Sequence, residues 1–244
     1  MMIVPFVVGV ILRSRVASLD AWLLPLAAAE LAAYLCFNAL TFWLRAAPSR
    51  RHTYTRPVVV YGLAAAASGG LAMALGAWPM LAWLPVALPM AALAIWLASQ
   101  RRDRDVLSGL ATVALAVGMG LVTRFVTPAG LLDDWPSQAR DALVMLGLFG
   151  YFFGTVWHVK ALIRERGQRR ARWRTLLWHA VMVGLAALGA VTGWTSGWWI
   201  VFFTITTLRS WWMTRPHVSS RLKPLQIGVT EIVLSLVALA ISLT

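Results

Sequence analysis

The sequence predicts an all-α membrane protein, a bundle of about nine transmembrane helices that forms a single domain over residues 1–244. Three observations support this prediction. Hydrophobic residues make up 60% of the chain and charged residues only 13%, whereas charged residues make up about 25% of a soluble domain. The apolar residues form runs of about 20, the length a helix needs to cross a bilayer. The basic residues gather in alternate connections between these runs. A soluble globular protein is therefore excluded.

Most of the apolar segments are long enough to span a membrane, and only the first is shorter. We predict spans near residues 22–44, 57–77, 79–98, 106–123, 139–162, 175–193, 196–213 and 225–243. The first segment stops at Arg13, so its roughly 12 residues reach only ~18 Å of a ~30 Å hydrocarbon core. A signal peptide carries positive charge before its apolar stretch, and no Lys or Arg precedes Arg13. We interpret this segment as a ninth helix whose beginning is missing.

The basic residues predict the orientation of the chain. When the spans are threaded back and forth, one side of the membrane receives all of the 22 Lys and Arg residues except Arg13, Arg15, Arg124 and Arg140. The positive-inside rule makes that side cytoplasmic. We therefore expect a multi-pass protein of the bacterial cytoplasmic (inner) membrane, with a cytoplasmic amino terminus and the carboxyl terminus outside.

Charge and cysteine content narrow the list of partners. The net charge of +13 is spread over short loops and not over a soluble domain, so we expect membrane lipids, and no nucleic acid, as partners of the basic residues. The single cysteine, Cys36, excludes an intramolecular disulfide and a Cys-based metal cluster. We predict no cofactor, and the sequence does not indicate an oligomeric state. Tryptophans at segment ends are interpreted as anchors at the membrane surface; they are Trp194, Trp198, Trp199, Trp211 and Trp212.

The predicted span 22–44 carries a stripe of polar residues. Glu30, Tyr34, Asn38, Thr41 and Arg45 are three or four positions apart and therefore share one helix face. An ionisable group at membrane depth needs a partner or a wet cavity. The stripe is either a hydrogen-bonded seam between two helices or one wall of a cavity open to the cytoplasm. Its continuity favours the cavity.

A second set of polar residues lies toward the cytoplasmic ends of later segments. Glu231 and Arg209 lie at similar levels on the last two spans, so they either form an ion pair or shape a site. Lys160 and Arg164 are one turn apart, and like charges at that spacing repel unless an anion or a carboxylate lies between them. They either hold an anionic group at the cytoplasmic mouth or extend toward lipid headgroups.

The sequence carries only a weak signal for a metal site and none of the common catalytic motifs. His158 and His179 stand at the cytoplasmic ends of consecutive helices, but two histidines without a third ligand indicate a metal or haem only weakly. We interpret them as hydrogen-bonding residues at a helix interface and predict no metal site. No Walker loop, HExxH, GxSxG or CxxC pattern is present in the sequence, so nucleotide-driven coupling and common hydrolase mechanisms lack support.

The residues after position 150 resemble a known family. The signature consists of FFGT at 152–155, VK at 159–160 and IRERG at 163–167, and it is similar to that of the YwiC-like family of bacterial integral membrane proteins. Residues 4–6, 56–57 and 224–231 resemble the family at corresponding places. The resemblance implies a multi-pass membrane protein without an assigned activity. Family members usually begin with a His-Gly-Ala-Trp motif that this chain lacks, so we expect the natural start codon to lie upstream.

The nine-helix plan is also similar to that of the UbiA prenyltransferase superfamily, in the place of Asn38 and of the basic loops. Those enzymes hold magnesium and an isoprenoid diphosphate with two Asp-rich motifs, because a diphosphate needs cations bound by carboxylates. Here Ala39, Phe42 and Ala46 stand where acids are expected, and the loop after residue 162 offers only Glu165. These residues do not support magnesium-dependent prenyl transfer.

Three functions remain open, and whether the protein is an enzyme remains open with them. The first is a cytoplasm-facing polar cavity that binds an anionic or amphipathic small molecule, in a carrier or an accessory role. The second is a divergent UbiA-like lipid-modifying enzyme without the Asp-rich motifs. The third is a non-catalytic assembly factor whose basic face docks a partner. The candidate cavity residues are Glu30, Tyr34, Asn38, Thr41, Arg45, Lys160, Arg164, Arg209 and Glu231.

Overall fold

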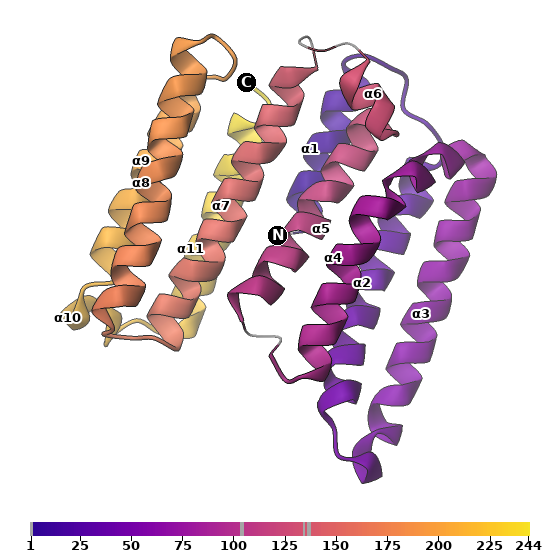
Figure 1. Cartoon of the computed structure of the whole chain (residues 1–244), viewed down its shortest axis with the longest axis horizontal. Coiled ribbons are helices and arrows are strands. Elements are labelled where there is room, and N and C mark those ends of the chain that lie inside the picture. Colours follow the sequence, from indigo (N-terminus) through magenta and orange to yellow (C-terminus); the bar gives the residue numbers. More distant parts are fainter. Residues whose placement is uncertain (1, 103–104, 134, 136–137) are drawn as a thin grey trace. The chain divides into compact units, whose positions relative to one another are not determined.

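The structure is a computed structural model that describes residues 2–102, 105–133, 135 and 138–244. Within these ranges the regular elements are all helical (Figure 1). Six helical runs are long and apolar enough to cross a membrane: Leu23–Arg45, His52–Ser99, Val106–Phe125, Ala139–Ile163, Arg169–Val191 and Pro224–Ile241. The prediction of an all-α membrane protein is therefore confirmed.

The predicted count of about nine spans is not confirmed by this criterion. The run His52–Ser99 counts once, although it contains two α-helices, α3 (His52–Ala72) and α4 (Leu84–Ser99). Helix α9 (Trp198–Met213) has 16 residues and α1 (Ile3–Ser14) has 12, and both fall short of the roughly 20 residues of a full span. Apolar composition alone therefore does not separate the helices that the chain forms.

A short irregular segment separates α3 from α4. Gly76 has a φ of +106°, a backbone conformation that glycine adopts without a steric penalty. A 3-10 turn, Trp78–Trp83, follows, and Pro79 lies near its start, where a missing N–H breaks no helical hydrogen bond. Figure 1 shows α3 and α4 as two separate helices. One 48-residue apolar run is thus divided by backbone geometry.

The helices belong to two compact units. Unit 1 comprises Met1–Val8 and Leu131–Thr244, and unit 2 comprises Gly9–Gly130. Unit 2 contains α2 (Leu23–Arg45), α3, α4 and α5 (Val106–Phe125); unit 1 contains α7 (Ala139–Ile163), α8 (Arg169–Val191), α9, α10 (Pro216–Ser219) and α11 (Pro224–Ile241). The short helix α6 (Pro128–Leu132) lies where the two units join in the sequence. The single domain stays a prediction, and each unit is described by itself.

In unit 2 the basic connections lie at one end. Arg101 Nη2 donates to the backbone oxygen of Arg45 at 3.4 Å, which links the α4–α5 connection to the end of α2. Helix α2 packs along α3, and α4 packs against α5 and α2. Trp83 Nε1 donates to the backbone oxygen of Val126 at 3.0 Å and links the α3–α4 connection to the end of α5. Within this unit, successive connections therefore lie at alternate ends of the helices, as the distribution of basic residues predicts.

Unit 1 shows the same separation of its two ends. Arg166 Nη2 donates to the backbone oxygen of Leu222 at 3.3 Å, so the basic α7–α8 and α10–α11 connections lie together. Arg140 Nη2 donates to the backbone oxygen of Thr244 at 3.0 Å, which brings the start of α7 to the end of α11. The two ends of the unit thus differ sharply in basic residues, as the positive-inside rule requires of a membrane protein.

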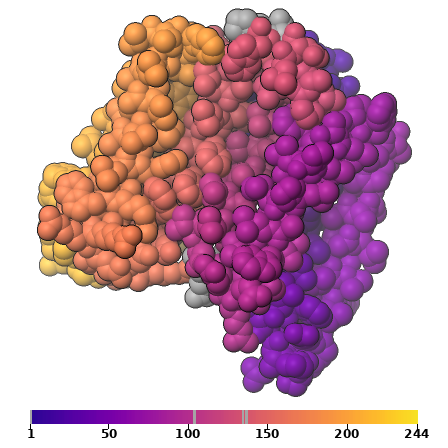
Figure 2. Space-filling model, viewed as in Figure 1, coloured from indigo at the N-terminus to yellow at the C-terminus, as the bar shows by residue number. Residues whose placement is uncertain are grey.

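Helix α8 presents an apolar face to the outside of unit 1. Leu177, Val181, Leu185 and Leu188 share one helix face, and each is more than half exposed. Figure 2 shows α8 in orange at the surface of this unit. A continuous apolar helix face of this kind is suited to contact with lipid tails.

The prediction of tryptophan anchors is wrong for one of the five. Trp194, Trp198, Trp211 and Trp212 are 41% to 59% exposed, but Trp199 is only 3% exposed. Its ring lies 5.7 Å from that of Phe203, centroid to centroid, in a stacked arrangement. Trp199 therefore belongs to the core. A position near a helix end indicates the depth of a side chain in the membrane, but it does not indicate the helix face on which the side chain lies.

The packing of α1 against α5 within unit 2 predicts the effect of a small substitution. A Cβ at Gly9 would overlap the backbone oxygen of Gly120 and the Thr123 hydroxyl, and backbone atoms cannot rotate away. We expect Gly9→Ala to destabilise the protein by about 1–3 kcal/mol. Thermal unfolding in a neutral detergent, followed by tryptophan fluorescence, measures the effect. Gly118→Ala is the control, because nothing lies within 4 Å of its Cβ; equal melting temperatures would contradict this packing.

Candidate functional site

The nine candidate residues lie in both units. Five belong to α2 in unit 2 and four to helices or connections of unit 1. The unit 2 set is Glu30, Tyr34, Asn38, Thr41 and Arg45, and the unit 1 set is Lys160, Arg164, Arg209 and Glu231. One cavity shared by all nine stays a prediction.

The polar stripe on α2 makes hydrogen bonds to its own helix. Asn38 Nδ2 donates to the backbone oxygen of Tyr34 at 3.0 Å, and Thr41 Oγ1 donates to that of Asn38 at 2.7 Å. Arg45 Nε donates to the backbone oxygen of Thr41 at 2.9 Å. Donors on a helix commonly reach the carbonyl one turn earlier. These bonds therefore satisfy polar groups within α2, and the choice between a seam and a cavity wall stays a prediction.

Glu30 differs from the rest of the stripe. Its Oε1 atom is buried and has no hydrogen-bond partner among the residues that the structure describes. A carboxylate is only an acceptor, and leaving it unpaired in an apolar environment is strongly unfavourable. Glu30 is therefore the stripe residue with the strongest need for a proton or a partner, while Tyr34 is half exposed.

An ion pair joins α9 and α11 in unit 1. Arg209 Nη1 contacts Glu231 Oε1, and the two side chains are only 8% and 14% exposed. The other carboxylate oxygen, Oε2, accepts a hydrogen bond from Thr155 Oγ1 at 2.9 Å and another from the Tyr151 hydroxyl at 3.3 Å. Thr155 and Tyr151 lie one turn apart on α7. Glu231 thus links three helices, and the ion pair expected from the sequence is present.

Arg209 has two buried donors that the ion pair does not use. Its Nε and Nη2 atoms have no hydrogen-bond partner within the described part of the chain. The N–H bonds of these two atoms point the same way and match the two oxygens of a carboxylate or a phosphate. Unsatisfied buried donors, especially charged ones, are unfavourable. The guanidinium therefore lacks acceptors for two charged donors among the residues that the structure describes.

Two fully buried imidazoles lie in the same unit. The ring centroids of His158 on α7 and His179 on α8 are 6.4 Å apart. His179 Nδ1 lies 2.7 Å from the backbone oxygen of Thr175, so this nitrogen carries the proton and donates. His179 Nε2 and both ring nitrogens of His158 have no partner among described residues.

The hydrogen bond of His179 lies within its own helix, α8, so the interpretation of both histidines as hydrogen-bonding residues at a helix interface stays a prediction. The described residues supply no such bond to His158. They also contain no group of three or more His, Cys, Asp and Glu side chains placed to hold a metal ion. The imidazoles therefore belong to a polar core whose hydrogen-bonding capacity is only partly used.

A glycine on α7 allows α8 to approach this core. A Cβ at Gly154 would lie 2.8 Å from Trp178 Cδ1 and 3.0 Å from His179 Nε2. Trp178 Nε1 in turn donates to the backbone oxygen of Gly150 at 2.8 Å. Gly154 and Thr155 belong to the FFGT signature, so this signature both brings α8 close and supplies a partner of Glu231.

Sequence reasoning did not identify Tyr151 and Thr155 as site residues. Both are buried, and their spacing of one turn was visible in the sequence. A tyrosine and a threonine in an apolar helix carry no charge, however, so the pattern of charged residues does not indicate them. The useful signal was a polar pair on one face of α7 opposite an acidic residue of another span.

At the predicted anion position beside Lys160 and Arg164, Lys160 pairs with a carboxylate of the chain itself. Lys160 Nζ lies 3.5 Å from Glu165 Oε1, and Arg174 Nη2 lies 2.5 Å from Glu165 Oε2. Glu165 is thus a carboxylate beside Lys160, and its second oxygen pairs with Arg174 of α8. Arg164 is exposed. An external anion at this position stays a prediction, and the structure adds no partner for it.

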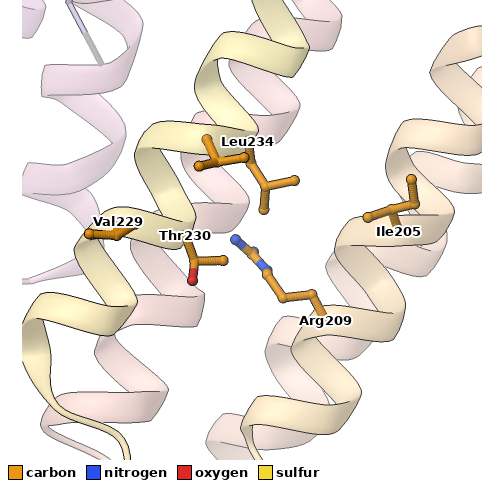
Figure 3. Close-up of a pocket in the computed structure, with 6 residues that line it drawn as sticks. Ile205, Arg209, Val229, Thr230 and Leu234 are labelled. Carbon is orange, nitrogen blue, oxygen red and sulfur yellow. The ribbon is translucent and has the colours of Figure 1, made fainter.

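An open groove of about 310 Å³ runs between α9 and α11. Figure 3 shows Arg209 extending from α9 toward α11, with its guanidinium between Thr230 and Leu234. Arg209 and Thr230 are the polar residues of the groove, and the other lining residues are aliphatic: Ile205, Val229, Val233 and Leu234. A groove with aliphatic walls and a guanidinium is suited to a molecule that has an acidic head and an apolar tail.

Comparisons with known proteins identify the family. The sequence model described as "YwiC-like protein" matches residues 1–124, half of the chain. The chain belongs to the YwiC-like family. The uncharacterized protein YwiC of Bacillus subtilis (strain 168) is 26% identical to this YwiC-like chain over 212 residues, which cover 86% of this chain and 81% of the relative. No solved structure matches the chain. The resemblance inferred from short signatures is confirmed.

The ion pair predicts a non-additive pattern of stability. Glu231→Gln or Arg209→Met alone leaves a buried charge without its partner, so each should destabilise the protein by about 3–5 kcal/mol. Replacing both residues, with Arg209→Met and Glu231→Leu, removes both charges and should restore much of that loss. Thermal unfolding of the four proteins in detergent measures the coupling. A double variant as unstable as the sum of the single variants would show that the pair does not hold α9 to α11.

Proposed function

We propose that the protein binds a small anionic or amphipathic molecule in the polar core of unit 1, in a carrier or an accessory role. The observation that carries this proposal is the unused pair of Arg209 donors, Nε and Nη2, in a side chain that is only 8% exposed. Burying such donors without an acceptor is unfavourable, and a bound anion removes that penalty. The ion pair with Glu231 holds the guanidinium in place.

The ligand class follows from the shape of the donors. Two parallel N–H bonds fit a group with two oxygens on one atom, as in a carboxylate or a phosphate ester. The groove beside Arg209, with Ile205 and Leu234 in its wall, supports an apolar tail on the same molecule. The shared chemistry is therefore an acidic head, either on a water-soluble anion or on an amphiphile.

We further propose the nine-helix topology in the bacterial inner membrane, with a cytoplasmic amino terminus and an outer carboxyl terminus. It counts α1, α2, α3, α4, α5, α7, α8, α9 and α11. Its support is the gathering of the basic connections at one end within each unit. In this topology Arg209 lies about one turn from the cytoplasmic end of α9, so the ligand enters from the cytoplasm.

Ligand-dependent thermal stabilisation tests the proposal. We expect decanoate, decyl phosphate, succinate or inorganic phosphate to raise the melting temperature of the protein in neutral detergent, and decanol to have no effect. Ligand present at about 100 times its dissociation constant adds about 2.7 kcal/mol of stability. Arg209→Lys keeps the charge but loses the paired donors, so affinity should fall by about tenfold or more. Arg221→Lys, at an exposed arginine of the same unit, is the control.

Each outcome separates the proposed ligand from its alternatives. Stabilisation by decanoate and decyl phosphate alone indicates an amphiphile, whereas equal effects of succinate and phosphate indicate a water-soluble anion. The absence of stabilisation by all four anions, or equal stabilisation of wild type and Arg209→Lys, would overturn the proposal. Release of pyrophosphate from an isoprenoid diphosphate with magnesium would instead support the UbiA-like enzyme. A loss of function limited to Arg169→Glu and Arg172→Glu would support the assembly factor.

A further inference from the structure

The charges in the polar core of unit 1 leave no surplus to balance a bound anion. Arg209 and Glu231 are paired with each other, so together they carry no net charge. An anion at Arg209 Nε and Nη2 adds one negative charge to a site whose side chains are largely buried. An uncompensated charge is strongly unfavourable in such surroundings. This step rests on the proposed function, because it takes the anion at Arg209 as given.

The groups that titrate around this core come from four helices. They are Tyr151 and His158 on α7, His179 on α8, Arg209 on α9 and Glu231 on α11. Arg209 is already protonated, and the Tyr151 hydroxyl already donates to Glu231. Glu231 already contacts the guanidinium through Oε1 and accepts a hydrogen bond from the Thr155 hydroxyl at Oε2. Among these groups, the two imidazoles are left to accept a proton.

Both imidazoles have a nitrogen that can take up a proton. His179 donates from Nδ1 to the backbone oxygen of Thr175, which leaves its Nε2 with a lone pair and no partner. Neutral His158 likewise has one nitrogen with a lone pair, and neither of its nitrogens has a partner among the residues described. Both rings are fully buried. His158 lies about one turn from Thr155 on α7, and the Thr155 hydroxyl donates to the carboxylate of Glu231, the partner of Arg209. The two imidazoles are therefore placed to respond to an anion at Arg209.

We propose that the site takes up one proton on the His158 and His179 pair for each anion that it binds. The proton comes from solvent, one N–H bond forms on an imidazole nitrogen, and no covalent bond of the anion breaks. Only one of the two rings is protonated, because two imidazolium rings with centroids 6.4 Å apart would repel each other. The occupied site then holds two positive and two negative charges, and its net charge returns to zero.

Proton uptake makes binding depend on pH in a defined direction. The occupied site holds one more proton than the empty site, so affinity increases as the pH falls. Where the full proton is taken up, affinity for the anion changes by about tenfold for each pH unit. The protein would thus bind an anion and a proton together, which is the property of a proton-coupled anion site.

Calorimetric titration with decanoate tests this inference. The carboxylate of decanoate is ionised above pH 7, so the probe itself contributes no proton. The heat of binding is measured in a sulfonate buffer and in an amine buffer of different ionisation enthalpy, and the difference gives the number of protons taken up. We expect about one proton for each decanoate bound by the wild type, and about tenfold tighter binding for each unit by which the pH is lowered.

Variants identify the groups that accept the proton. His158→Gln combined with His179→Gln should bind decanoate more weakly, with no proton uptake and with an affinity independent of pH. His217→Gln, at an exposed histidine of α10, is the matched control and should behave as the wild type. If the double variant does not fold, the single variant His158→Gln and the pH dependence of the wild type decide the question.

The results that contradict proton uptake differ from those that contradict the proposed function. Decanoate binding without proton uptake in the wild type overturns this inference and leaves the proposed function intact. Uptake of a full proton by the double variant also overturns it, because another group then accepts the proton. Absence of binding by decanoate, decyl phosphate, succinate and inorganic phosphate alike overturns both proposals.

Discussion

The packing of α7, α9 and α11 in unit 1 depends on the contacts that the carboxylate of Glu231 makes with the other two helices. Glu231 accepts hydrogen bonds from α7 and an ion pair from α9 while its own backbone belongs to α11. Lipid tails are as apolar as leucine, so apolar burial alone gives membrane helices little reason to associate. Polar links and close backbone approach must specify the contacts instead. Gly154, which admits Trp178 and His179 of α8, provides the second of these.

Composition and charge are enough to predict the class of fold, because length, hydropathy and loop charge are properties of local sequence. The boundary between α3 and α4 shows where such information ends. The predicted break between two spans near residue 78 lies inside the observed one, but the helix ends were not predicted, because α3 ends at Ala72 and α4 begins at Leu84. The intervening residues are as apolar as the helices. The division depends on one positive φ angle at Gly76, and an apolar window cannot reveal it.

Candidate residues were predictable when their charge required a partner and unpredictable when their role depended on helix rotation. The pair of Arg209 and Glu231 is of the first kind. Thr155 is of the second kind, because a hydroxyl can satisfy itself on its own helix. On α2 this is what Asn38 and Thr41 do, since both have donors that reach a carbonyl one turn earlier. Glu30 has no such option, because the interior of a helix offers carbonyl oxygens and no free N–H groups.

The same count of donors and acceptors supports the proposal of an anion, and not a cation, as the ligand of unit 1. Glu231 Oε1 is paired with Arg209, and Oε2 receives hydroxyl hydrogen bonds from Tyr151 and Thr155, so its capacity is largely used. Arg209 retains two buried donors without acceptors. A cation would need acceptor oxygens that are already engaged, whereas an anion supplies the acceptors that the guanidinium lacks. The excess of donors over acceptors, and not the net charge of the chain, is therefore the argument for the proposed ligand class.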